Sequence, residues 1–361
     1  MNEILLEYLN KYGKCPVDYV LSKFEHHDIV LLGEMHGVKQ QLELYHKLIP
    51  RLAEHGINTI AYEFARREDQ AWVDELLDKS DFDVSLAKKI MIKQEAYWGY
   101  QEYLDVFRLV WSVNKGLPAS QKIRILGLND PINWPLYNQI CRQKNRKPNA
   151  EEITECWKGC GERYWADVIS EHYHPNQTKI LGIMGSHHAF TKYKEPSWRL
   201  EGDEKVFDGF KTVRFGNHLQ QRYGEKLFNI CFYDPWESRW ATEKPLHPAG
   251  GIIEQVISPH YPELGFDLKG SPLGDLQDES FYALGYPDFR LKDIFDGMIY
   301  TGRLQDLQPV TPIADFIDEE NFSLFRDYVA YNDDADKSIA ELNAIIHGYA
   351  VGAVGLPPKT F

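Results

Sequence analysis

The sequence has few cysteines, no excess of positive charge and no long apolar run. Its 5 cysteines form no C-x-x-C pair, so we expect free thiols rather than a disulfide framework. Lys plus Arg number 40 against 54 Asp plus Glu, a net charge of −14. Nucleic acids and anionic membranes attract clustered Lys and Arg, so neither is an expected partner.

No segment has the roughly 20 consecutive apolar residues that cross a bilayer. The first residues carry acids where a secretion signal carries basic side chains, which predicts a cytoplasmic protein. The Walker loop, the G-x-G-x-x-G fingerprint and the G-x-S-x-G elbow are also absent, so nucleotide binding and serine-hydrolase chemistry lack their usual signatures. With 43% hydrophobic and 26% charged residues, the composition is that of a chain with a packed core.

Short apolar runs alternate with helical patterns along the first half of the chain. The runs that predict strands are 28–33, 58–64, 122–128 and 178–184, with further candidates at 211–215, 227–233 and 297–301. Strands that alternate with helices are typical of a parallel sheet covered on both faces. The sequence therefore predicts an α/β fold with a central, mainly parallel sheet flanked by helices. We expect a single domain over 1–361, with a helical insertion at 135–175 and C-terminal helices at 319–350.

Acidic residues and histidines lie at the ends of the first four predicted strands. They are Glu34 and His36 after the first strand, Glu63 at the end of the second, Asp130 after the third, and His187 and His188 after the fourth. The carboxyl ends of parallel strands share one edge of the sheet, and ligands bind there. These side chains are therefore expected to converge on one site.

The chemistry of such a cluster has two forms. A histidine held by a carboxylate suits general-base work on water or an alcohol, and a second histidine can act as an acid or stabilise an oxyanion. The same residues could instead ligate a divalent metal. The residue types alone leave both readings open.

Three segments resemble the erythromycin esterase family. They are Leu-Gly-Glu-Met-His-Gly at 32–37 with the helix that follows it, Ile-Ala-Tyr-Glu at 60–63, and Gly-Ser-His-His-Ala at 185–189. The segments 215–230 and 295–300 are similar to later parts of the family pattern. The wider superfamily also holds ChaN-like haem-uptake proteins and the Tiki/TraB group, and the Glu-x-His spacing here is closer to theirs.

The resemblance implies roles for individual residues. It makes His36 the base, with Glu34 and Glu63 in support and His188 as the second histidine. The esterases carry an arginine near the position of Tyr45, which this chain lacks. We expect substrate-binding side chains instead at Lys39, Arg66, Asp130 and His187.

The function expected from these residues is a hydrolase that activates water against an ester, lactone or amide in a small-molecule or peptide substrate. No cofactor is favoured. One alternative is a Tiki/TraB-like peptidase with a divalent metal held by Glu34, His36, Glu63 and His188. Another is a ChaN-like protein that binds haem or a peptide without catalysis.

Overall fold

The structure is a computed structural model that describes residues 1–211, 213–330 and 337–352. Two compact units are distinguished in it. The first contains Met1–Leu44 and Lys179–Gln308, and the second contains Tyr45–Thr178 and Pro309–Ala353. The single-domain expectation stays a prediction, and each unit is described by itself.

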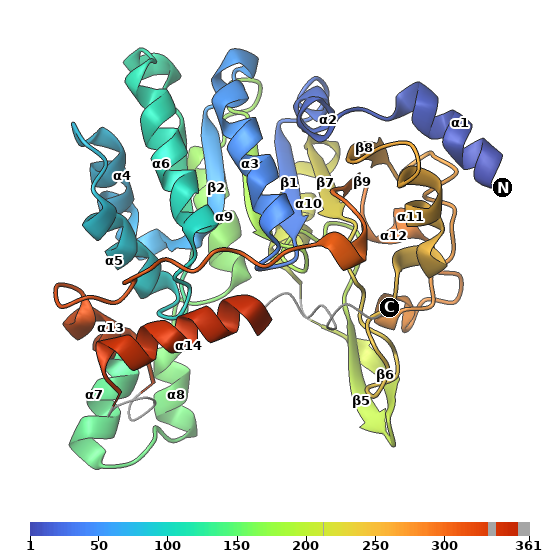
Figure 1. The fold of residues 1–361 in the computed structure, drawn as a ribbon. Helices are drawn as coiled ribbons and strands as arrows, with labels where there is room; N and C mark the ends of the chain where they lie inside the picture. The colour runs from blue at the N-terminus through green and yellow to red at the C-terminus, as the bar shows by residue number, and fades with distance from the viewer. Residues whose placement is uncertain (212, 331–336, 353–361) are drawn as a thin grey trace. The chain divides into compact units, whose positions relative to one another are not determined.

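The first unit is built on strands that lie side by side (Figure 1) in the order β4-β1-β7-β9-β8. Their bounds are β1 Ile29–Glu34, β4 Ile180–Gly185, β7 Leu227–Phe232, β8 Leu264–Asp267 and β9 Gly297–Tyr300. The strands β4, β1, β7 and β9 pair in parallel, while β8 runs antiparallel to β9. All residues of β1 are buried, as its unbroken apolar run predicts for an inner parallel strand.

Helices surround these strands, and a hairpin made of β5 and β6 is attached to them (Figure 1). The helices are α1 Asn2–Tyr12, α2 Pro16–Lys23, α10 Phe215–Tyr223, α11 Ile252–Ile257 and α12 Leu291–Ile294, and the hairpin strands are β5 Pro196–Glu201 and β6 Glu204–Phe210. Short 3₁₀ helices span Gly224–Lys226, Pro248–Gly251, Phe281–Ala283 and Leu304–Asp306. Helix α3, Lys39–Leu52, follows β1 directly. Gly37 makes the turn between them with a φ of 80°, a conformation that glycine adopts without steric cost.

The second unit pairs β2, Thr59–Arg66, in parallel with β3, Arg124–Asn129. Its helices are α4 Gln70–Asp78, α5 Val84–Gln94, α6 Gln101–Lys115, α7 Trp134–Lys144, α8 Ala150–Cys156, α9 Glu162–His172, α13 Phe322–Tyr328 and α14 Ile339–Gly352. Its 3₁₀ helices are Ala53–His55, Arg67–Asp69 and Ala119–Gln121. The expected insertion 135–175 contains α7, α8 and α9, and the expected C-terminal segment 319–350 contains α13 and most of α14.

The predicted fold class is confirmed: the chain is an α/β protein with mainly parallel strands flanked by helices. The strand predicted at 211–215 is wrong, because β6 ends at Phe210 and Phe215 already begins α10. Arg214 caps that helix, and its backbone N–H donates to the Asn217 side chain. The five cysteines are free thiols. No helix within the described residues is both long and apolar enough to cross a membrane.

Candidate functional site

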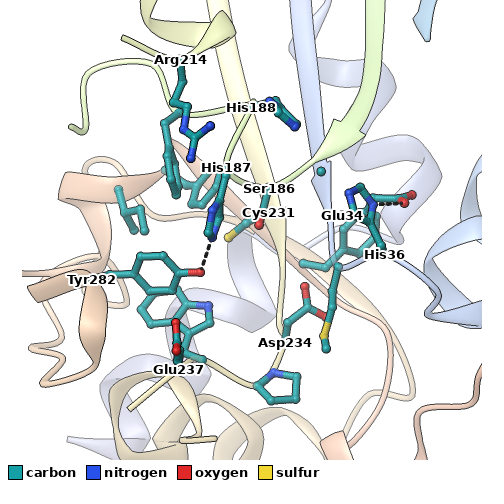
Figure 2. A pocket seen from close by; sticks show the side chains of 18 residues that line it. Glu34, His36, Ser186, His187, His188, Arg214, Cys231, Asp234, Glu237 and Tyr282 are labelled. Carbon is teal, nitrogen blue, oxygen red and sulfur yellow. Dashed lines mark hydrogen bonds and ion pairs between the residues drawn. The ribbon is translucent and has the colours of Figure 1, made fainter. Parts of the chain in front are cut away.

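A cavity of about 360 Å³ opens in the first unit where β1, β4 and β7 end. Figure 2 shows the side chains that line it. The polar ones at the strand ends are Glu34 and His36 after β1, Ser186, His187 and His188 after β4, and Cys231 and Asp234 around the end of β7. The order β4-β1-β7 brings these three ends together, as expected for neighbouring parallel strands.

Glu34 and His36 form a pair at the edge of this cavity (Figure 2). The Nδ1 atom of His36 lies 3.1 Å from the Glu34 Oε1 atom. The Glu34 side chain is fully buried, whereas 37% of the His36 side chain is exposed. A carboxylate can only accept a hydrogen bond, so this contact favours the imidazole proton on Nδ1 and leaves Nε2 able to accept another proton.

Gly185 lies directly beneath the His36 ring. A Cβ atom at Gly185 would come within 2.7 Å of His36 Cε1 and 2.8 Å of Nε2, and within 3.6 Å of His188 Cδ2. Both imidazoles therefore approach the same backbone position at the end of β4. Glycine is the residue that leaves room for this close approach.

His187 lies on another side of the cavity (Figure 2) and contacts different partners. Its Nε2 atom is 2.9 Å from the Tyr282 hydroxyl, and its Nδ1 atom is 3.4 Å from Glu195 Oε1. Burial lowers the pKa of His187 to about 4, although the Glu195 charge acts to raise it. His187 is therefore neutral at physiological pH.

Asp234 is a buried acid that also lines the cavity. The side-chain amide of Gln41 donates to Asp234 Oδ1, and Gln41 Oε1 in turn accepts from the backbone N–H of Met35. Burial raises the pKa of Asp234 to about 8, and the nearby charge of Glu34 acts in the same direction. Asp234 is therefore mostly protonated at neutral pH. The nearby acid Glu34 is the one that contacts His36.

Asp234→Asn is expected to make the protein more stable than wild type at alkaline pH. Between pH 4 and 8 the folded state holds the Asp234 proton and the unfolded state releases it, so the free energy of unfolding falls as pH rises through this window. Asparagine keeps an acceptor for Gln41 and does not titrate. The difference between variant and wild type should grow by at least about 1 kcal/mol from pH 5 to pH 8, since each unit of pKa shift corresponds to about 1.4 kcal/mol.

Urea unfolding at both pH values measures this effect. The exposed Asp81→Asn is the control and should show no such growth. Equal pH dependence of wild type and Asp234→Asn would mean that Asp234 is ionised in the folded protein.

The remaining predicted site residues are not among the described residues that line this cavity. Glu63, Arg66 and Asp130 belong to the second unit, and Lys39 belongs to the first. Strand β2 continues to Arg66, so Glu63 lies within the strand rather than at its end.

Around the ends of β2 and β3 the predicted residues contact partners of their own unit. Arg66 donates to Glu68 at 2.6 Å and to the Tyr328 hydroxyl at 3.1 Å. Asp130 lies 2.8 Å from the Arg67 Nε atom. Burial raises the pKa of Asp130 to about 6, while Arg67 acts to lower it.

Within the described part of the chain, no group of three or more His, Cys, Asp and Glu side chains is arranged to hold a metal ion. The predicted ligand set Glu34, His36, Glu63 and His188 is divided between the two units. The expectations about cofactors therefore stay predictions.

Sequence reasoning did not select Asp234, Tyr282 or Glu195. Asp234 carries the same signal as the predicted residues, because it follows the apolar run 227–233. Tyr282 and Glu195 lie outside the predicted strands, and no local pattern distinguishes them from other loop residues.

A known family model matches the part of the chain that contributes Glu34 and His36 to this site. Residues 20–134 match the family model described as haem-binding uptake, Tiki superfamily, ChaN. The resemblance inferred from the sequence is confirmed. The match covers β1 with Glu34 and His36, and it ends before β4 and the histidines that follow it. No curated protein sequence matches the chain.

Several solved structures share the fold of this chain at low sequence identity. A protein from Bacillus cereus aligns with a TM-score of 0.53 and 12% identity, over 87% of this chain and 100% of its own. A succinoglycan biosynthesis protein aligns at 0.55 and 11%, over 86% and 98%. An erythromycin esterase variant in its open conformation aligns at 0.51 and 13%, over 87% and 98%. At these identities the likeness concerns the fold.

Proposed function

We propose that the protein is a hydrolase that activates water at His36 against an ester, lactone or amide carbonyl. The observation that carries the proposal is the Glu34–His36 pair, in which a buried carboxylate lies 3.1 Å from a part-exposed imidazole at a cavity. A buried carboxylate beside a part-exposed histidine that lines a cavity is an arrangement typical of a general base. The expected substrate is a small molecule or a peptide.

In the proposed reaction, His36 Nε2 takes a proton from water as the water oxygen forms a bond to the carbonyl carbon. The imidazolium is stabilised by the Glu34 carboxylate. When the tetrahedral intermediate collapses, the bond from carbon to the departing oxygen or nitrogen breaks, and that atom takes the proton from His36. The hydroxyl of the water thereby enters the carboxylic acid product, and its proton enters the departing alcohol or amine. His36 returns to its neutral form.

His188 is the residue proposed to stabilise the oxyanion or the departing group, because it lines the same cavity and its ring, like that of His36, lies close to Gly185. Glu63 keeps its predicted supporting role, but the proposal does not depend on it. The reaction as written uses the side chains of the chain and water. A bound divalent metal or haem is tested below as an alternative.

The test is turnover of a panel of p-nitrophenyl esters, lactones and short peptides by purified protein, with and without added Zn²⁺ or Mg²⁺. Hydrolysis that persists with a chelator and is lost in His36→Asn supports the proposal. Hydrolysis only with added metal favours the peptidase alternative. The description of the family model for residues 20–134 makes haem binding the second candidate, and a Soret band on haemin addition without hydrolysis would favour it.

A further inference from the structure

Tyr282 and His187 are hydrogen-bonded on the wall of the cavity away from the Glu34–His36 pair (Figure 2), and Glu195 contacts His187 from the other side. The Tyr282 hydroxyl is 2.9 Å from His187 Nε2, and His187 Nδ1 is 3.4 Å from Glu195 Oε1. Tyr282 and His187 line the cavity. Glu195 lies behind them and is buried.

Glu195 is held as a carboxylate by two cations. Lys211 donates to Oε1, and the Arg214 Nε atom donates to Oε2 at 2.7 Å. Burial acts to raise the pKa of Glu195, but the hydrogen bonds from Lys211 and Arg214 and the charge of Arg214 act to lower it, and the pKa lies below its usual value. Glu195 therefore keeps its negative charge and can only accept hydrogen bonds.

The Glu195 carboxylate determines which atom donates the proton in each contact of this row of side chains. The His187 proton belongs on Nδ1, facing Glu195, and Nε2 is left as an acceptor. The Tyr282 hydroxyl must then donate its proton to His187. Its oxygen consequently offers lone pairs to the cavity, so Tyr282 acts there as a hydrogen-bond acceptor.

Packing holds the Tyr282 ring in place. Its centroid is 5.1 Å from that of Trp236 and 5.3 Å from that of Phe281, with the ring pairs edge to face. The backbone carbonyl of Tyr282 accepts a hydrogen bond of 2.6 Å from the Tyr193 hydroxyl. The position of the acceptor oxygen is thus determined by its surroundings.

The charged groups around Tyr282 are paired with one another. Glu237 lines the same cavity, and its Oε1 atom accepts a hydrogen bond from the ammonium group of Lys205. Arg214, the arginine on the cavity wall, is ion-paired with Glu195. A substrate group placed here therefore meets the Tyr282 oxygen as a hydrogen-bond acceptor beside compensated charges.

We propose that the Tyr282 end of the cavity is a subsite for a hydrogen-bond-donating substrate group, a hydroxyl or an amine. Tyr282 is the residue that selects this group, because its oxygen accepts a hydrogen bond and a group that only accepts, such as a carboxylate, finds no donor in it. The inference rests on the proposed function, because it assigns the substrate class of the same site. The substrate is then an ester, lactone or amide that carries a hydroxyl or amine away from the scissile carbonyl.

The kinetic test uses three matched p-nitrophenyl esters: the 6-hydroxyhexanoate, the hexanoate and the hydrogen adipate. Wild type is expected to favour the hydroxyl ester over the hexanoate by about 3- to 10-fold in kcat/KM, the range of one neutral hydrogen bond, and to turn over the adipate ester most slowly. Tyr282→Phe should remove the advantage of the hydroxyl ester.

Tyr286→Phe is the matched control, because it also removes a tyrosine hydroxyl. In wild type, the Tyr286 hydroxyl contacts the backbone of Lys194 instead of the cavity. The control variant should keep the wild-type preference. Equal rates on the three esters, or an unchanged preference in Tyr282→Phe, would overturn the inference while leaving the hydrolase proposal intact.

A second measurement is independent of turnover. Nitrogen-15 NMR of the histidine rings should show His187 neutral with its proton on Nδ1, and the Nε2 resonance should move in Tyr282→Phe. Addition of 6-hydroxyhexanamide should shift that resonance, whereas hexanamide and adipamate should not. If these shifts occur and no ester is cleaved, the ester-hydrolase proposal fails and the subsite stands. If the proton lies on Nε2, or no probe shifts the resonance, the subsite is overturned.

Discussion

Replacing His36 by alanine is expected to lower the rate of hydrolysis by about 10² to 10⁴, the range for loss of a general base. The free energy of unfolding should change by about 1 kcal/mol or less, as for many substitutions at the surface. The structural reason is that 37% of the His36 side chain is exposed at the cavity edge, so it contributes little to the core. Rates on the best substrate of the panel and melting temperatures measure the two effects.

His260→Ala is the control for this variant, because His260 is an exposed histidine of the same unit. It should keep both rate and melting temperature. If His36→Ala melts far below wild type yet retains turnover, His36 is a structural residue, and the proposed reaction loses its base.

Replacing Gly185 by alanine should lower activity strongly without unfolding the protein. The new Cβ would come within 2.7 Å of the His36 ring, closer than non-bonded carbon atoms approach. The far end of a part-exposed side chain can move away at small cost, so the ring should leave its position beside Glu34. A displacement of about 1 Å in a catalytic group can reduce the rate by about 10²-fold.

The measurement is again rate and melting temperature, together with a structure of the variant. Gly116→Ala serves as the control, since a Cβ there meets only an ordinary contact at 3.7 Å, and it should be neutral. Full activity in Gly185→Ala would show that the observed ring position of His36 is not needed for the reaction.

The strand-end argument selected six residues, and four of them line one cavity in the first unit: Glu34, His36, His187 and His188. This was possible because the runs 28–33 and 178–184 are continuous and apolar, and because adjacent parallel strands end at the same edge. The same argument placed Glu63 at the end of its strand, whereas β2 continues past it to Arg66 with an irregularity in the pairing to β3. The functional roles of these residues stay predictions.

Other parts of the site depend on residues far apart in the chain. Asp234 is protonated because burial and the Glu34 charge act on it together, and no local pattern contains that information. Tyr282 comes from the short 3₁₀ helix Phe281–Ala283, 95 residues beyond His187. Their hydrogen bond depends on tertiary contacts that no local pattern contains.

The sequence by itself determined the elements and the residue types at their ends. Apolar runs and helical periodicity depend on near neighbours, so the α/β class and the Glu34–His36 motif could be inferred directly. Only the tertiary structure decided the protonation of Asp234, the direction of the Tyr282–His187–Glu195 chain and the close approach of His36 to Gly185. These properties arise from burial and from distances between segments remote in sequence, which set electrostatic energies that local patterns do not encode.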